Sequence, residues 1–234
     1  ALEKVGVIFT DRQNVDKVEK MKVCTCLNPL HTALAIFGCL LGYGKISDEM
    51  KDADLRKMVE IIGYTEGLPV VVDPLILSPK AFIDEVIQVR IPNPFMPDTP
   101  QRIATDTSQK LAIRFGETIK SYVARDDLDV STLRLIPFVL AGWCRYLLGI
   151  DDDGNPFTVS SDPMLDTLRH QLEGLVLGQP GPFDTVLSPI LSNKKIFGVD
   201  LIEIGLDQAI LDDFTAMMAG PGAVRTTLQR HLSM

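Results

Sequence analysis

The sequence contains few cysteines and few basic residues, and each scarcity argues against a class of protein. The four cysteines among its 234 residues are Cys24, Cys26, Cys39 and Cys144. Their spacing matches no disulfide framework, and no second Cys/His pair follows at the spacing of a tetrahedral zinc site. We therefore expect reduced, buried thiols, a cytoplasmic location and no metal. The net charge of −8 argues against a nucleic-acid partner, which would require a basic stripe.

Long hydrophobic runs and glycine-rich nucleotide motifs are missing as well. The longest apolar run, near residues 33–41, is shorter than the roughly 18 residues that a membrane span requires, and it contains Gly38. The first residues, ALEKVGVIFTD, do not resemble a signal peptide, and because they lack a starting Met we expect the chain to be part of a longer protein. No G-x-G-x-x-G sequence and no P-loop occurs, so we expect another domain to hold any nucleotide cofactor.

Helical patterns fill most of the chain, and 46% hydrophobic residues are enough for a sizeable core. Four prolines between Pro92 and Pro100 interrupt these patterns. Residues 151–162 are a polar turn rather than an EF-hand, because the required Gly and Glu positions are not occupied. Residues 5–10 and 70–72 are the strand candidates, so the predicted fold is mainly α, multi-helical, with few short strands. The predicted helices cover residues 16–27, 30–41, 47–62 with Ser47 as N-cap, 79–89 after Ser78, 109–122, 131–148, 163–177, 207–218 and 226–232.

Three polar residues near the start of the second helix are candidates for chemistry. Asn28 followed by Pro29 is typical of an N-cap and a first helical residue, and His31 would share a helix face with Asn28. In one interpretation they are a cap and a core histidine bonded to the backbone, which the spacing alone favours. In the other, Lys22 takes the proton of a secondary alcohol as its hydride leaves, while Asn28 and His31 hydrogen-bond the alcohol oxygen. That chemistry requires no metal.

The segment MKVCTCLNPLHTALAIFGCLLGY resembles the active-site segment of the polyol-specific long-chain dehydrogenases, the mannitol dehydrogenase and fructuronate reductase family. The family pattern is a lysine, four residues, an asparagine, two residues and a histidine, and Asn28, His31, Ala33 and Gly38 occupy its positions. Three further stretches resemble the family in the same order along the chain: RIPNPFMPDTPQRIATDTSQK, LIPFVLAGWCRYLLGIDDDGNPFTVSSDP and TTLQRHL. The resemblance thus extends over nearly the whole chain.

What the resemblance implies is the C-terminal half of an oxidoreductase that interconverts a sugar alcohol or hexonate and its keto form. Residues 1–234 would be its helical, substrate-binding and catalytic domain, similar to the C-terminal domain of 6-phosphogluconate dehydrogenase. The N-terminal Rossmann domain, which binds NAD or NADP in the family, would be absent from this chain. We therefore expect the chain alone to be inactive and to bind a nicotinamide cofactor weakly or not at all.

The resemblance also implies roles for single residues. Lys22 would be the general acid/base, and Asn28 and His31 would be the pair that binds the developing oxyanion. Considered without the family, Arg102 and Lys110 would be solvated basic residues beside a proline-rich turn. Within the family, two basic positions face the substrate and one asparagine lies in the same loop, and the residues that match them are Arg102, Lys110 and Asn93.

One departure from the family pattern affects Lys22. Five residues, rather than four, separate it from Asn28. Because each helical residue turns about 100°, an extra residue would move Lys22 to another face of the helix. A single-turn π-bulge would absorb the extra residue, and such bulges are frequent at functional sites. Pro29 offers another adjustment, and Lys20 is the alternative lysine.

Other functions and substrates stay open. A non-catalytic helical packing or dimerisation module predicts that Lys22, Asn28 and His31 diverge and that Arg102 lies far from them. A phosphogluconate-type dehydrogenase would need a phosphate-binding basic cluster, which the sequence does not show. A carboxylate substrate would require a bidentate arginine. Arg102 suits either a carboxylate or hydroxyl groups, so the choice between a sugar and a sugar acid is left open.

Overall fold

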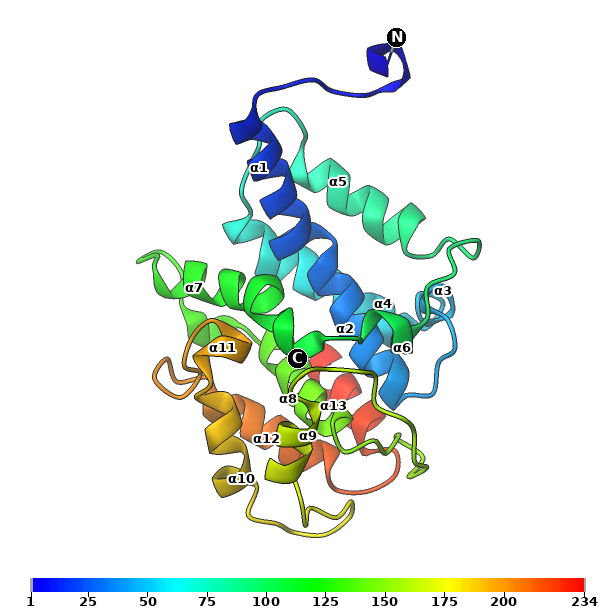
Figure 1. Cartoon of the computed structure of the whole chain (residues 1–234), viewed down its shortest axis with the longest axis vertical. Helices are drawn as coiled ribbons and strands as arrows, with labels where there is room; N and C mark the ends of the chain where they lie inside the picture. Colours follow the sequence, from blue (N-terminus) through cyan, green and yellow to red (C-terminus); the bar gives the residue numbers. More distant parts are fainter. Residues whose placement is uncertain (1, 234) are drawn as a thin grey trace.

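The computed structural model describes residues 2–233, and its regular secondary structure is helical (Figure 1). The predicted mainly α class is confirmed. The two predicted strands are wrong: their segments contain the 3₁₀ turns Leu2–Val5 and Leu68–Val70 and otherwise irregular backbone. Within the described range no strands pair, and one isolated bridge joins Ile150 to Pro156. Without a neighbouring strand, a valine-rich segment cannot satisfy its backbone groups as a sheet.

A long helix through the centre of the molecule positions the candidate site (Figure 1). It begins as α1 (Arg12–Met21), passes through a π-helical segment (Lys22–Cys26) and continues as α2 (Asn28–Leu40). By length and composition Arg12–Leu40 could cross a membrane, but 78% of its most apolar window is buried inside the protein. A helix that is apolar on all sides belongs in a core, and α2 has this position. All four cysteines are free and buried, as predicted.

The predicted helix over residues 47–62 is divided into two. α3 (Ile46–Glu49) is a single turn, and α4 (Ala53–Glu60) begins after Asp52. The Asp52 carboxylate accepts hydrogen bonds from two backbone N–H groups in the first turn of α4. Asp52, and not Ser47, is therefore the N-cap of the longer helix, because its side chain satisfies donors that the helix leaves free.

Helical structure continues past Gly63, the predicted end, in the π-helical segment Ile61–Gly67. Gly63 allows close packing there, because a Cβ atom would come within 2.5 Å of Ile83 in α5 (Pro79–Glu85). α5 begins as predicted, with the Ser78 hydroxyl accepting from a backbone N–H of its first turn. The segments that follow are the π-helical Val86–Arg90, α6 (Pro100–Ile103), the 3₁₀ turn Thr107–Gln109, the π-helical Ala112–Gly116 and α7 (Glu117–Val123).

α6, which follows the proline-rich loop, packs along α2 (Figure 1). Gly38 of α2 permits this approach, because a Cβ atom there would overlap Pro100 and the Glu49 carboxyl group. The hydroxyl of Thr99 caps α6 by accepting from the Arg102 N–H at 3.2 Å. Arg102, the basic residue in α6, is thereby held beside α2.

The second half of the chain forms a helical bundle beneath this region. Its centre is α8 (Leu135–Tyr146), which is buried along its whole length and packs against α12 (Asp207–Met217). Glu66 fixes the start of α8, since its carboxylate accepts three backbone N–H bonds of 2.7 to 2.8 Å. The remaining elements are the 3₁₀ turn Val130–Thr132, α9 (Leu165–Gln171), α10 (Phe183–Leu191), α11 (Lys194–Phe197) and α13 (Ala223–Leu232).

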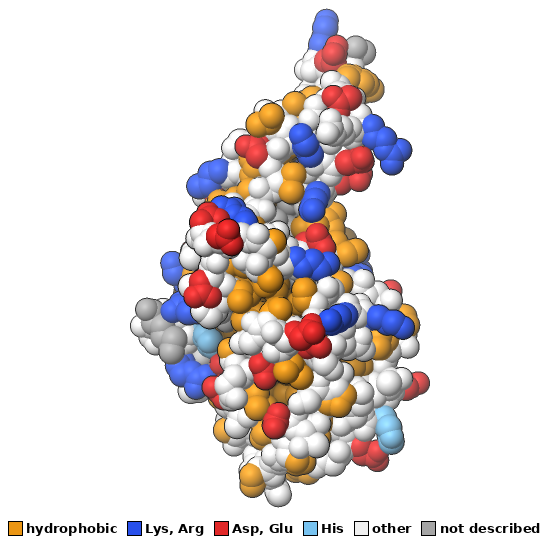
Figure 2. All heavy atoms as spheres, turned by 90° about the vertical axis from the view of Figure 1, so that its left-hand side faces the viewer, with side chains coloured by type: hydrophobic (Ala, Val, Ile, Leu, Met, Phe, Trp, Pro, Cys, Tyr) orange, Lys and Arg blue, Asp and Glu red, His pale blue; other side chains and the backbone are white. Residues whose placement is uncertain are grey.

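Residues 2–11 form an arm that projects away from the body of the molecule (Figure 1). Figure 2 shows hydrophobic side chains among the charged ones on this arm. Val7, Ile8 and Phe9 are exposed, and Phe9 is 65% accessible. The arm therefore contributes little to the core of the described domain.

Candidate active site

The π-helical segment absorbs the extra residue between Lys22 and Asn28. The Leu27 N–H donates to the Lys22 carbonyl oxygen at 3.1 Å, a bond that spans five residues where an α-helical bond spans four. Pro29 supplies a physical reason, because it has no N–H to donate and its ring would clash with the Thr25 carbonyl group in a regular α-helix. The predicted π-bulge is confirmed.

Asn28 and His31 both lie in the first turn of α2, with half-buried side chains. The prediction that Asn28 is the N-cap is wrong: Leu27 occupies that position, and no side chain caps the helix. The backbone leaves the helical conformation at Leu27 (φ −131°, ψ −64°), so Asn28 is already the first residue of α2 and lacks the extended conformation of a capping residue. Within residues 2–233 no hydrogen bond holds either side chain, so the cap-and-core interpretation finds no support here.

His31 lies among positive charges. Burial and the guanidinium groups of Arg114 and Arg102 lower its pKa to about 4. The imidazole is therefore neutral at physiological pH, with one N–H to donate and one nitrogen lone pair. A non-catalytic packing module predicts that Arg102 lies far from His31, whereas the charge of Arg102 acts on this imidazole.

Arg114 is anchored to the same turn of α2, although the sequence separates it from α2 by many residues. Its Nη1 donates to the Thr32 hydroxyl at 2.5 Å, and that hydroxyl donates to the Asn28 carbonyl oxygen at 2.8 Å. Burial lowers the pKa of Arg114 to about 10. We did not predict Arg114 from the sequence. Its spacing of four residues from Lys110, in a predicted helix, is the signal that identifies it.

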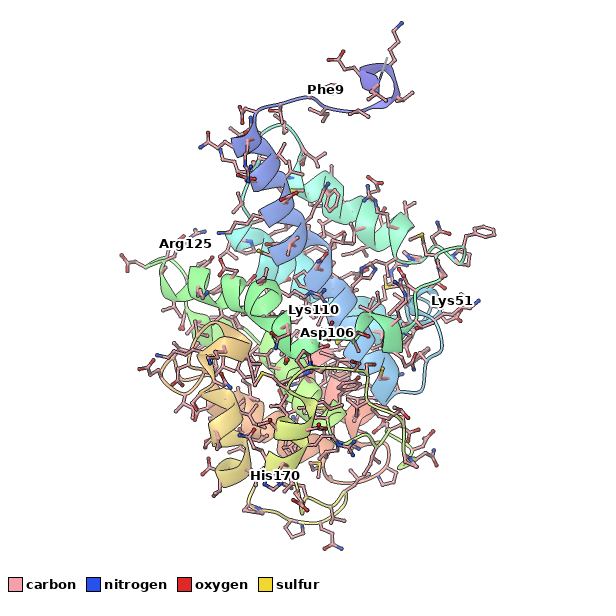
Figure 3. The ribbon with its side chains drawn as sticks, in the orientation of Figure 1. Phe9, Lys51, Asp106, Lys110, Arg125 and His170 are labelled. Carbon is pink, nitrogen blue, oxygen red and sulfur yellow. The ribbon has the colours of Figure 1, made fainter. Side chains whose placement is uncertain are left out.

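The predicted substrate-binding cations already have protein partners. Arg102 forms an ion pair with Asp98, and its side chain is 60% exposed. The Lys110 ammonium group donates to the Thr105 carbonyl oxygen. Burial, together with the nearby positive charge of Arg114, lowers the pKa of Lys110. Figure 3 shows Lys110 near Asp106, at the centre of the molecule beside α6.

Lys22 has different surroundings from those of His31. Its Nζ lies 5.4 Å from the centroid of the Phe82 ring. It also lines a hollow of about 400 Å³, together with residues such as Val18 and Ile76, and this hollow is not lined by Asn28 or His31. The charges of Arg102 and Arg114 thus act on His31, whereas no hydrogen bond or ion pair between described residues joins the Lys22 side chain to Asn28 or His31. The separate position of Lys22 is what a non-catalytic packing module predicts.

The two remaining candidates are engaged in local structure. Lys20, the alternative lysine, forms an ion pair with Glu117 of α7 at 3.6 Å. The Asn93 side-chain oxygen accepts from the Phe95 N–H at 3.0 Å and so stabilises its own turn. A role for Asn93 in substrate binding stays a prediction.

Comparison with known proteins identifies the family. The model of the mannitol dehydrogenase C-terminal domain matches residues 14–217. The chain belongs to the mannitol dehydrogenase family. This finding confirms the resemblance seen in the active-site segment and the stretches that follow it.

Curated relatives are longer than this chain. A D-mannonate oxidoreductase of Thermotoga maritima is 59% identical over 224 residues, which are 96% of this chain and 41% of that protein. A mannitol 2-dehydrogenase of Neosartorya fischeri is 31% identical over 220 residues, 92% of this chain and 40% of that protein. The chain thus spans about two fifths of the length of these mannitol dehydrogenase family members.

Solved structures agree on the fold. The mannitol 2-dehydrogenase of Pseudomonas fluorescens, in ternary complex with NAD and D-mannitol, matches with a TM-score of 0.83 and 24% identity, over 100% of this chain and 44% of that one. A D-sorbitol dehydrogenase in substrate-free form matches with a TM-score of 0.76 and 25% identity, over 97% of this chain and 43% of that one. These likenesses confirm the helical C-terminal-domain fold of the family.

Proposed function

We propose that this chain is the substrate-binding and catalytic domain of an oxidoreductase that interconverts an acyclic sugar alcohol or sugar acid and its keto form. The observation that carries the proposal is the pair Asn28 and His31, side by side in the first turn of α2 with half-buried side chains and no partner within residues 2–233. Of the two substrate classes, the 59% identity to a D-mannonate oxidoreductase supports the mannonate/fructuronate pair.

In this proposal Asn28 and His31 hold the reacting oxygen. The Asn28 amide and the neutral imidazole each offer an N–H group to an oxygen that gains negative charge as its proton leaves. The low pKa of His31 suits this role, because a histidine that stays neutral donates a hydrogen bond without competing for the proton. The positive end of the α2 dipole adds to the same stabilisation.

Lys22 is the proposed proton-transfer group. In the oxidation direction the hydroxyl proton passes to the Lys22 amine while the carbon loses hydride and becomes a carbonyl carbon. In the reduction direction Lys22 returns that proton to the oxygen. The π turn supports this assignment, because it absorbs the residue that otherwise separates Lys22 from the family pattern.

A nicotinamide cofactor, NAD or NADP, would accept or supply the hydride in the whole protein. The described residues contain no strand and therefore no β-α unit of the kind that holds a dinucleotide. We infer that an N-terminal Rossmann domain, absent from this chain, binds the cofactor, and that this chain alone is inactive. A reaction without a metal and a cytoplasmic location are part of the same proposal.

The test is a substrate panel with the whole protein. Polyols, ketoses, hexonates and hexuronates are each assayed with both cofactors, in the oxidation direction with NAD⁺ and NADP⁺ and in the reduction direction with NADH and NADPH. Turnover should appear with at least one hexonate/hexuronate or hexitol/ketose pair. Absence of turnover across the panel would contradict the proposal. Micromolar NADH binding by the chain alone, about −8 kcal/mol, would contradict the inferred division between two domains.

A further inference from the structure

Arg102 and Arg114 act on His31 in the first turn of α2, and Lys110 lies close to Arg114. These three cations differ in how they are neutralised. Arg102 has the carboxylate of Asp98, and Lys110 has the carbonyl oxygen of Thr105. Arg114 has only a neutral partner, the hydroxyl group to which its Nη1 donates at 2.5 Å. Within residues 2–233 no carboxylate lies at ion-pair distance from its guanidinium group.

This arrangement leaves most donors of the half-buried Arg114 available to an anion. A guanidinium group carries five N–H donors, of which the Thr32 hydroxyl satisfies one. Removing such a charge from water without a counter-charge is unfavourable. Burial lowers the pKa of Arg114 to about 10, and no neighbouring carboxylate opposes that shift. The hydroxyl bond and the π-helical segment Ala112–Gly116 nevertheless hold the group in place.

Two carboxylates, Asp106 and Asp162, act on Lys110, four residues before Arg114. Asp162 accepts the Ser108 N–H at 2.7 Å and the Ser108 hydroxyl at 2.5 Å, and it also accepts the Met164 N–H at 2.9 Å. The pKa of Lys110 is lowered by burial and by the charge of Arg114, and the negative charges of Asp106 and Asp162 partly offset that shift. No carboxylate of residues 2–233 forms an ion pair with Arg114, so its guanidinium group is available to an anion from outside the chain.

We propose that Arg114 binds the carboxylate of an acyclic sugar acid and so gives the enzyme its preference for sugar acids over sugar alcohols. The inference rests on the proposed function. One planar guanidinium group matches one carboxylate in a bidentate pair. Arg114 is tied through Thr32 to the Asn28 carbonyl oxygen, so the acid end of the substrate would lie beside the residues that hold the reacting oxygen.

The test compares Arg114→Gln with wild type in the whole protein, using D-mannonate and D-mannitol as probes. KM for D-mannonate should rise about 100-fold, because a charged bidentate pair is lost. kcat for D-mannonate and kcat/KM for D-mannitol should change less than about 3-fold. Arg114→Lys, which keeps the charge but loses the planar fork, should recover part of the loss.

Two further variants separate recognition from folding. Arg125→Gln is the matched control, because Arg125 lies in the loop just beyond the end of α7, away from Lys110 (Figure 3), and pairs with Asp127. It should leave both substrates unaffected. Thr32→Val keeps the Arg114 charge but removes its anchor, and it should raise KM for D-mannonate about 5-fold to 10-fold.

The outcomes distinguish this inference from the proposed function. Equal losses of Arg114→Gln on D-mannonate and D-mannitol, or no loss on either, would overturn the carboxylate site. A wild-type protein that turns over D-mannitol as efficiently as D-mannonate would also overturn it while leaving the proposed function intact. Absence of turnover with every probe would instead contradict the proposed function itself.

Discussion

Two regions of the molecule withdraw arginine and histidine side chains from solvent, and they treat these side chains differently. In the bundle around α8, the buried Arg145 donates to three backbone carbonyl oxygens, and His231 shares a 2.7 Å hydrogen bond with Asp213. In the first turn of α2, Arg114 meets one hydroxyl group and His31 has no partner within the described residues.

The difference separates a scaffold from a site. Buried polar groups are normally satisfied by hydrogen bonds. In the bundle the Arg145 guanidinium group and the His231–Asp213 pair follow that rule, although Trp143 Nε1 and His231 Nδ1 have no partner within the described residues. Side chains left without partners lower stability, and proteins retain them mainly where a ligand completes their interactions. We therefore expect substitutions in the bundle to lower stability and substitutions around α2's first turn to lower activity.

The largest expected effect comes from Lys22→Ala in the whole protein. Turnover should fall about 10³-fold, within the range for loss of a general acid/base, and the fall should persist at every pH. The melting temperature should change little, because the Lys22 ammonium group contacts the face of the Phe82 ring and forms no ion pair within the described residues. Lys20→Ala is the matched control. Inactivation by Lys20→Ala with retained activity in Lys22→Ala would reverse the assignment.

The next largest effect is expected for Glu66→Ala in the bundle, which should lower the free energy of unfolding and not the activity. It removes the acceptor of three N–H groups at the buried start of α8. Leaving such donors unsatisfied should lower the free energy of unfolding by about 3 kcal/mol, measured by urea denaturation. Glu66→Gln keeps one carbonyl acceptor and should lose less. A change below about 1 kcal/mol would mean that water replaces the carboxylate.

His31 should make stability depend on pH. Its pKa is lowered from 6.5 to about 4, so between these values the unfolded chain binds more protons than the folded one. Stability is therefore fully present above pH 6.5 and falls as the pH decreases toward 4, by up to about 3 kcal/mol. Urea denaturation as a function of pH should show a shallower dependence in His31→Leu. An unchanged dependence would contradict a buried, neutral His31; His170→Leu, at an exposed position, is the control.

The smallest expected effect lies in the ion-pair network between α4 and α13. Arg225 contacts Asp52 at 2.6 Å and Asp54 at 3.1 Å, with 27% of its side chain exposed. Arg225→Gln should lower the free energy of unfolding by about 1 kcal/mol, and the difference should shrink in about 1 M salt. A difference that salt does not reduce would mean that packing, rather than charge, carries the effect.

Local sequence signals predicted most of the helices but not all of their limits. Ser78 predicted the start of α5 because a hydroxyl cap acts on its own first turn. Ser47 was predicted as the cap of this helix, but the structure uses Asp52 as the cap of α4. Asp52 also accepts from Tyr43 at 2.6 Å and pairs with Arg225, and these tertiary contacts are not visible in the local sequence. α10 was not predicted, since it contains Pro189.

For the candidate site too, local sequence signals predicted some residues and missed others. Asn28 and His31 share a turn because helical spacing alone determines it, and the π turn followed from one extra residue relative to the family pattern. Arg114 was missed because its contact with Thr32 joins residues 82 positions apart. Contacts over such distances arise from packing of the whole chain, which a local pattern does not contain.

The comparison of the two histidines tests the account most directly. His31→Leu and His231→Leu are made in the whole protein, and kcat/KM and the melting temperature are measured for both. We predict that His31→Leu lowers kcat/KM about 100-fold and leaves the melting temperature unchanged or higher. His231→Leu should instead lower the melting temperature, because Asp213 loses its 2.7 Å partner, and largely preserve kcat/KM. Retained activity with a lower melting temperature in His31→Leu would contradict the assignment of α2's first turn as the active site.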